Sequence, residues 1–199
     1  MSRAPLPIFL ASSSPRRREL LRQIGRQATV VPAHADEDWP ALPAAEAAVK
    51  VARDKLRVAR DKHLAAHDPA NAGPWLAADT VVVARGEIYG KPKDEADAAR
   101  MLRGMAGRAH EVITGFVVAR GADERARAVT TRVTMRAYGD AEIARYVAAG
   151  EAADKSGAYA IQSGGTVLCE RLDGSLSNVV GLPIAEVLAA FAALGDAHA

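Results

Sequence analysis

The central segment of the chain reads Trp75-Leu76-Ala77-Ala78-Asp79-Thr80-Val81-Val82-Val83-Ala84. An apolar run rich in β-branched valine is typical of a buried strand. The stretch 44–67 before it carries apolar residues at spacings of three and four, which predicts one long amphipathic helix. A second helix is expected over 95–105, with Asp94 as its N-cap. Strands and helices therefore alternate, which predicts an α/β fold.

The flanking segments continue this alternation. Residues 8–11 form a predicted short strand, which leads into Ser14 as an N-cap and Pro15 as the first residue of a helix ending at Ile24. Further strands are expected at 29–32, around Ile88 and at 111–120, 126–136, 158–161, 166–171 and 178–180, and further helices at 140–149, capped by Asp140, and at 183–194. We expect one domain over residues 1–199, in which helices flank a mixed, bent sheet in two lobes about a cleft, with no clean linker.

Composition excludes several classes of protein. Of the 199 residues, 49% are apolar, 25% are charged and 5% are aromatic, which is typical of a soluble globular protein. The formal charge of +2 and the scarcity of aromatic residues argue against a nucleic-acid groove. No apolar stretch reaches the roughly 18 residues of a membrane span, and the N-terminal run is too short for a signal peptide. The single Cys169 makes neither an internal disulfide nor a zinc site, so a cytoplasmic location is expected.

A first candidate site is the segment Ser12-Ser13-Ser14-Pro15-Arg16-Arg17. A strand end here supplies hydroxyls, backbone amides and two guanidinium groups to one helix N-terminus, an arrangement that favours a bound phosphate. The alternative is an ordinary Ser-Pro cap followed by arginines in solvent. The pattern alone supports both interpretations equally.

Asp79 is the second candidate. A carboxylate inside a buried strand costs several kcal/mol unless it is paired, hydrogen-bonded or bound to a cation. As a functional group, Asp79 would bind a divalent metal ion or act as a general base on water. The alternative is a structural aspartate whose charge is satisfied by its neighbours.

The remaining candidates are weaker on their own. Lys55, on the border of the buried helix stripe, and Lys91 and Lys155, in loops, are ordinary surface lysines unless they converge on Asp79. Glu37 lies in an acidic loop and would be a second metal-binding carboxylate. Gln162 precedes a Gly-Gly pair, where an amide side chain suits the recognition of a polar ligand.

Seven blocks, in order and spacing, resemble the Maf family: Leu10-Ala11-Ser12-Ser13-Ser14-Pro15-Arg16-Arg17, Asp36-Glu37, Val51-Ala52-Arg53-Asp54-Lys55, Ala78-Asp79-Thr80-Val81-Val82, Gly90-Lys91-Pro92, Asp154-Lys155-Ser156-Gly157-Ala158-Tyr159-Ala160-Ile161-Gln162 and Val180-Gly181-Leu182-Pro183. The resemblance covers nearly the whole chain. Maf proteins are nucleoside triphosphate pyrophosphatases with an elongated α/β fold around a deep cleft, similar to the inosine triphosphatase fold.

The resemblance implies a role for each candidate. Asp79 would be the proton acceptor, and the cleft would be completed by Glu37, Lys55 and Lys91. Ser12, Arg16 and Arg17 would bind phosphate, and Asp79 with Glu37 would hold Mg²⁺ or Mn²⁺ together with phosphate oxygens. Arg16, Thr80 and Gln162 resemble the branch that acts on dTTP and UTP, whereas the branch that acts on 7-methyl-GTP tends to carry Trp, Gln and Glu there. The resemblance also implies a homodimer.

The expected activity is therefore hydrolysis of a nucleoside triphosphate to the monophosphate and pyrophosphate. The expected partner is this small molecule, with no nucleic acid and no membrane. Three alternatives remain open: a non-catalytic nucleotide-binding regulator of septum formation, a 7-methyl-GTP pyrophosphatase, and a hydrolase of other phosphate esters that releases orthophosphate.

Overall fold

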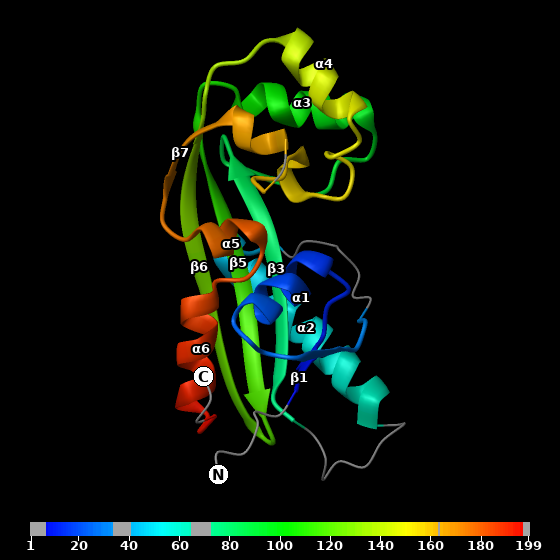
Figure 1. Ribbon diagram of the computed structural model, residues 1–199, viewed down its shortest axis with the longest axis vertical. Helices are drawn as coiled ribbons and strands as arrows, with labels where there is room; N and C mark the ends of the chain where they lie inside the picture. Colours follow the sequence, from blue (N-terminus) through cyan, green and yellow to red (C-terminus); the bar gives the residue numbers. More distant parts are fainter. Residues whose placement is uncertain (1–6, 34–40, 65–72, 163, 197–199) are drawn as a thin grey trace. The chain divides into compact units, whose positions relative to one another are not determined.

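A computed structural model describes residues 7–33, 41–64, 73–162 and 164–196 (Figure 1). The strands are β1 (Ile8–Leu10), β2 (Ala28–Val30), β3 (Trp75–Ala84), β4 (Glu87–Tyr89), β5 (Ala109–Arg120), β6 (Asp123–Met135) and β7 (Cys169–Asp173). The helices are α1 (Pro15–Gln23), α2 (Ala44–Leu64), α3 (Glu95–Met105), α4 (Asp140–Ala148), α5 (Leu176–Val180) and α6 (Ile184–Ala193). Within these ranges, no helix is both long enough and apolar enough to cross a bilayer.

The strands form one mixed sheet in the order β2-β1-β3-β5-β6-β7, with β4 added beside β3. β1 is parallel to both β2 and β3, whereas β4 is antiparallel to β3 and β7 is antiparallel to β6. In β6, Thr131, Val133 and Met135 are buried and alternate with more exposed residues, as predicted for a sheet with one wet face. The α/β class and the mixed sheet are thus confirmed.

The chain folds into two compact units. Unit 1 comprises residues 1–79, 114–129 and 181–199, and unit 2 comprises residues 80–113 and 130–180. Strands β3, β5 and β6 each contribute residues to both units.

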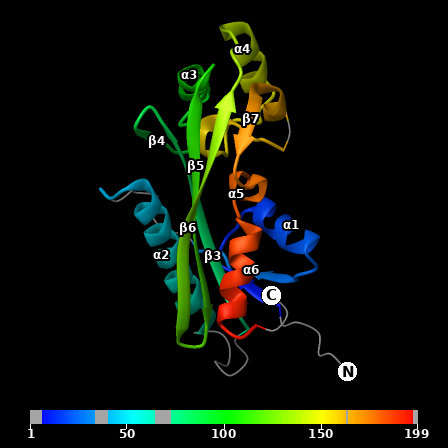
Figure 2. The same cartoon turned by 90° about the vertical axis from the view of Figure 1, so that its left-hand side faces the viewer.

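Unit 1 is built on the close approach of α2 to the sheet. Figure 2 shows α2 on one face of the sheet and α1 and α6 on the other. A Cβ atom placed on Gly115 of β5 would lie 2.3 Å from the carbonyl carbon of Ala48, so the two backbones are in direct contact. The buried stripe of α2, with Ala52, Leu56 and Ala59, packs with Trp75 and Val117. The predicted amphipathic helix therefore covers this face.

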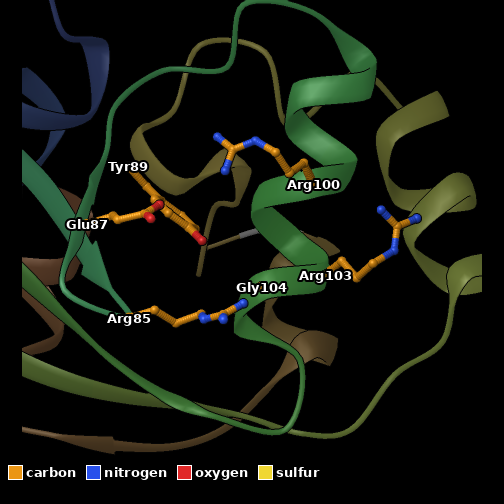
Figure 3. Close-up of a pocket in the computed structure, with 6 residues that line it drawn as sticks. All are labelled: Arg85, Glu87, Tyr89, Arg100, Arg103 and Gly104. Atoms are coloured by element: carbon orange, nitrogen blue, oxygen red, sulfur yellow. The ribbon is translucent and has the colours of Figure 1, made fainter.

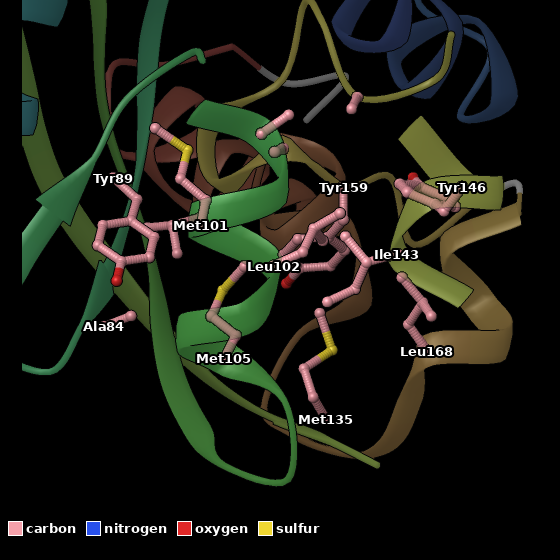
Figure 4. Close-up of a cluster of buried hydrophobic side chains, with 14 of the residues drawn as sticks. Ala84, Tyr89, Met101, Leu102, Met105, Met135, Ile143, Tyr146, Tyr159 and Leu168 are labelled. Carbon is pink, nitrogen blue, oxygen red and sulfur yellow. The ribbon is translucent and has the colours of Figure 1, made fainter. Parts of the chain in front are cut away.

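Unit 2 has its own core, to which α3 and α4 contribute. Asp94 caps α3 as predicted, because its carboxylate accepts a hydrogen bond from the backbone amide of Asp97. The β3–β4 hairpin packs against α3, where a Cβ on Gly104 would lie 2.6 Å from the Tyr89 hydroxyl (Figure 3). The core gathers apolar side chains from most elements of the unit (Figure 4), among them Met101, Leu102, Met105, Met135, Ile143, Tyr159 and Leu168.

Several predictions about residues 140–180 are wrong. No strand forms over 158–161, because Gly157 and Ala158 have positive φ angles of 74° and 60° and close a 3-10 turn, Ser156–Ala158, instead. The segment 178–180 lies in α5, where the Ser175 hydroxyl accepts a hydrogen bond from the backbone amide of Asn178 and caps the helix.

Two further boundaries differ. The predicted strand 166–171 begins as a 3-10 turn, Gly164–Leu168, and becomes β7 only at Cys169. Asp140 is the first residue of α4 and Gly139 is its N-cap, so the acidic side chain lies in the first turn, where the helix dipole favours it.

Candidate active site

The parallel pairing of β1 with β3 brings the segment 12–17 close to Asp79. Leu10 lies opposite Leu76, and the Ala11 amide donates to the Leu76 carbonyl over 2.8 Å. Because the two strands run in the same direction, Ser12 and Asp79 follow within a few residues at the same edge. Both residues belong to unit 1 and both are buried.

Asp79 is paired with Lys55. The Lys55 ammonium donates a hydrogen bond to Asp79 Oδ1, and the two side chains expose only 13% and 12% of their surface. Lys55 follows Ala48 by seven residues, and therefore lies near the face of α2 whose backbone touches β5 at Gly115. The sheet places β5 next to β3, so this close contact allows a lysine on the border of the buried stripe to reach Asp79.

The pair balances two charges that would each be costly to bury alone. Removing one partner of a buried ion pair leaves an uncompensated charge and costs about 3–5 kcal/mol. Asp79 is therefore satisfied within the fold, while its second carboxylate oxygen can still act on a ligand.

Arg17 holds the start of α1 against a distant segment. Its Nε donates to the Gly181 carbonyl over 2.8 Å, and one terminal nitrogen donates to Ser12 Oγ over 3.0 Å. Burial lowers the pKa of Arg17, whereas the negative charge of Asp79 acts to raise it. Arg17 therefore ties the start of α1 to the segment around Gly181, and the Ser12 hydroxyl also accepts a hydrogen bond from the Ser14 amide over 3.2 Å.

The N-terminus of α1 is rich in positive charge. Ser14 is the N-cap and Pro15 is the first helical residue, as predicted, but the Ser14 side chain makes no capping hydrogen bond. The first turn contains no acidic residue, and it includes Arg16, which is half-buried. Cations at this end oppose the helix dipole unless an anion lies between them.

Three predicted site residues belong to unit 2. Thr80 is held through its carbonyl, which accepts a hydrogen bond from the Ser156 hydroxyl over 3.0 Å. The adjacent Gly157 amide donates to the Gly90 carbonyl over 3.0 Å, so the loop that carries Lys91 is tied to the same turn. A Cβ on Gly157 would meet Val82 at 2.9 Å, which is why only glycine fits this close approach.

Lys91 and Gln162 are exposed, and Gln162 lies in a turn rather than at the end of a strand. Lys155 pairs with Asp154 at 2.5 Å. Glu37 lies outside the described residues. The structure therefore groups Ser12, Arg17, Lys55 and Asp79 within unit 1, and it ties the segments of Thr80 and Lys91 together within unit 2.

The donor set fits a divalent metal ion that is shared with a ligand. In the described ranges, no three His, Cys, Asp or Glu side chains form a group that would hold an ion alone. Mg²⁺ is commonly bound by one or two carboxylates together with substrate phosphates. Asp79 supplies one such carboxylate beside the phosphate-binding candidates, so the residues fit a metal bound together with phosphate.

Comparison with known proteins shows the family of the chain. The family model described as Maf-like protein matches residues 7–194. The chain belongs to the Maf family. A dTTP/UTP pyrophosphatase of Anaeromyxobacter dehalogenans is 47% identical over 190 residues, which cover 92% of this chain and 91% of that protein. A dTTP/UTP pyrophosphatase of Geobacter sulfurreducens is 47% identical over 91% of this chain and 93% of its own length. One from Chromobacterium violaceum is 41% identical over 98% of both chains.

Two positioning residues of this Maf family chain were not predicted. The Gly181 carbonyl accepts a hydrogen bond from the Arg17 guanidinium, and the Ser156 hydroxyl donates a hydrogen bond to the Thr80 carbonyl. Both lie in blocks that resemble the family, yet neither type of residue signals a role by itself. A backbone carbonyl carries no sequence signature, and an isolated serine is common in turns.

Proposed function

We propose that this chain hydrolyses dTTP and UTP to the nucleoside monophosphate and pyrophosphate. Membership of the Maf family and the names of its relatives support this activity. The observation that carries the proposal is the buried Lys55–Asp79 pair beside Ser12 and Arg17, because it couples a potential base to a potential phosphate site.

In the proposed reaction, water attacks the α-phosphorus and the bond from this phosphorus to the oxygen that bridges to the β-phosphate breaks. Asp79 orients the water and accepts its proton, while pyrophosphate leaves with the bridging oxygen. Lys55 keeps the carboxylate in place and supplies positive charge next to the reacting phosphate. Fixing these groups in position reduces the reorganisation needed in the transition state.

Positive groups compensate the charge that spreads over the phosphate oxygens. Arg16 lies in the first turn of α1, where the dipole and the absence of an acidic residue both favour an anion. Arg17, which is held by the Gly181 carbonyl and the Ser12 hydroxyl, and Lys91, in an exposed loop, would add further positive charge. Arg16, Thr80 and Gln162 would also select the pyrimidine nucleotide.

A divalent ion completes the proposal. Mg²⁺ or Mn²⁺ held by Asp79, with Glu37 as a second carboxylate, would polarise the phosphates when bound. We also propose a homodimer in the cytoplasm, which size-exclusion chromatography and cell fractionation would check.

The test is a panel of dTTP, UTP, CTP and 7-methyl-GTP, assayed for pyrophosphate with metal and with chelator. We expect metal-dependent release of pyrophosphate from dTTP and UTP. Preference for 7-methyl-GTP would assign the chain to the other branch, and release of orthophosphate would indicate a different ester hydrolase. Binding of dTTP without turnover would support a regulator instead.

The Asp79→Asn variant tests the chemistry, and because it also leaves the Lys55 ammonium without its charged partner, the assay is run where circular dichroism shows that the variant is folded. It preserves the shape of the side chain but removes the base, and general-base catalysis contributes about 10²–10⁴ in rate. We expect kcat to fall by that factor while the circular dichroism spectrum stays unchanged. Retained dTTP hydrolysis would remove Asp79 from the catalytic role.

A further inference from the structure

Unit 2 contains a pocket made of residues that the proposed activity does not use. It has a volume of about 380 Å³ and is lined by Arg85, Glu87, Tyr89, Arg100, Arg103 and Gly104. Pockets that bind small molecules typically have volumes of about 300–1,000 Å³. The β3–β4 hairpin forms one wall and α3 forms the other (Figure 3). The lining is thus dominated by guanidinium groups and contains a single carboxylate.

Arg85 occupies an unfavourable backbone position. Arg85 and Gly86 are the two loop residues of the hairpin, and their φ angles are 56° and 80°. Positive φ at both positions is the type I′ turn, in which Asn-Gly is preferred, so an arginine at the first position is disfavoured. Among the described residues Arg85 has neither a hydrogen bond nor an ion pair. Because Arg85 is exposed and lines the pocket, its guanidinium is accessible to a ligand.

The second cation of the pocket is Arg100. It pairs with Asp97 at 2.8 Å, and its guanidinium carbon lies 5.4 Å from the centre of the Tyr89 ring. Two of its N–H donors bond Asp97, which leaves further donors for a ligand. Arg103 differs, because it pairs with Asp140 at 2.8 Å and is turned toward α4. Arg85 and Arg100 are therefore the two cations of the pocket whose guanidinium groups have donors left for an anion.

Glu87 is the acidic group of the pocket, and its carboxylate lies between the Arg85 and Arg100 side chains in Figure 3. It lies two residues before Tyr89 on β4, so both side chains point to the same face of the strand. A carboxylate is a hydrogen-bond acceptor that repels a bare anion but favours hydroxyl groups. Gly104 keeps the opposite wall open, since a Cβ there would collide with the Tyr89 hydroxyl.

We propose that this pocket binds a phosphomonoester that carries neighbouring hydroxyl groups, such as a sugar phosphate or a nucleoside monophosphate. The phosphate is bound by Arg85 and Arg100, because planar guanidinium groups match phosphate oxygens. The hydroxyl groups donate hydrogen bonds to Glu87. The site is separate from the residues assigned to hydrolysis, so its existence does not depend on that activity.

Backbone amide NMR of the full chain tests the proposal with ribose 5-phosphate, UMP, inorganic phosphate and ribose as probes. We expect ribose 5-phosphate to shift the Gly86 and Gly104 signals in a saturable way, inorganic phosphate to do so more weakly, and ribose to leave them unchanged. A stronger effect of UMP than of ribose 5-phosphate would identify the nucleotide as the source of the phosphate. Unshifted Gly86 and Gly104 signals with every probe would overturn the site.

Arg85→Asn is the most informative variant. Asn-Gly is favoured in the β3–β4 turn, so this change removes the guanidinium group without disturbing the backbone. We expect a melting temperature that is unchanged or higher, and affinity for ribose 5-phosphate at least about tenfold lower, as for the loss of a charged hydrogen bond. Arg132→Ala, an exposed arginine on β6, is the matched control and should retain affinity. Equal affinity in Arg85→Asn and the unaltered chain would overturn the proposal.

Glu87→Gln tests the hydroxyl contact. This change removes the negative charge that repels phosphate, so inorganic phosphate should bind more tightly. The preference for ribose 5-phosphate over phosphate should shrink, because an amide is a weaker acceptor than a carboxylate. An undiminished preference would contradict the role of Glu87.

Discussion

A Cβ atom on Gly115 would lie 2.3 Å from the carbonyl carbon of Ala48, so the backbone of α2 rests directly on β5. Lys55 lies two turns further along α2 and reaches Asp79 on the neighbouring strand β3. The separation between helix and sheet therefore determines whether the ion pair can form.

Gly115→Ala should push α2 away from the sheet. Overpacking of a core costs about 1–3 kcal/mol, and a clash with backbone rather than with a flexible side chain places this change at the upper end. We expect the free energy of unfolding in urea to fall by about that amount, and dTTP turnover to fall with it. Gly139→Ala is the control, because no atom lies within 4 Å of its Cβ position. Comparable losses in both variants would refute the explanation.

The Lys55–Asp79 pair should show strong coupling. Lys55→Met leaves a buried carboxylate without its partner, so the free energy of unfolding should fall by about 3–5 kcal/mol. The double variant Lys55→Met with Asp79→Leu should recover most of this loss and be inactive. Lys50→Met breaks the exposed Lys50–Asp54 pair on the same helix and should cost less than about 1 kcal/mol. Additive effects in the double variant would argue against coupling.

Arg17 and Arg16 should differ although they are neighbours. Arg17→Met loses the hydrogen bonds to Gly181 and Ser12, so the free energy of unfolding should fall by about 2 kcal/mol. Arg16→Met should cost less than about 1 kcal/mol and should instead raise KM for dTTP. Thermal melts and steady-state kinetics check both. A larger loss of stability in Arg16→Met than in Arg17→Met would reverse the two assignments.

His110 should make stability depend on pH. Its ring is buried, its Nε2 lies 2.8 Å from the Tyr159 hydroxyl, and burial lowers its pKa from 6.5 to about 4. In the unfolded chain the ring takes up a proton near its ordinary pKa, so the unfolded state binds more protons between these values. The contribution of the neutral His110 ring to the free energy of unfolding is complete above pH 6.5. It decreases as the pH falls and is gone below about pH 4. The loss is about 3 kcal/mol in total.

Urea denaturation across this range checks the prediction. His110→Gln keeps a group that can hydrogen-bond Tyr159 but does not titrate, so its stability should change less with pH than that of the unaltered chain. Parallel pH profiles for the two proteins would show that His110 is not the group responsible.

Local sequence predicted the elements whose signals lie within a few residues. The apolar run 75–84 formed β3, and the Asp94 cap placed the start of α3 correctly. At 158–161 and 178–180 the apolar residues suggested strands. A turn forms at the first segment, because Gly157 and Ala158 have positive φ angles. A helix forms at the second, where the Ser175 hydroxyl caps α5. Short apolar runs fit a strand, a turn or a helix equally well, so tertiary packing selects among them.

The amino-acid pattern alone was enough to single out Asp79, because a charge in a buried strand needs a partner wherever the strand lies. The folded chain shows that this partner is Lys55 of α2, and that Arg17 donates a hydrogen bond to the Gly181 carbonyl 164 residues away. Such contacts depend on the register of β1 against β3 and on the depth at which α2 packs. Both are set by the simultaneous packing of segments far apart in the chain, so no local pattern encodes them.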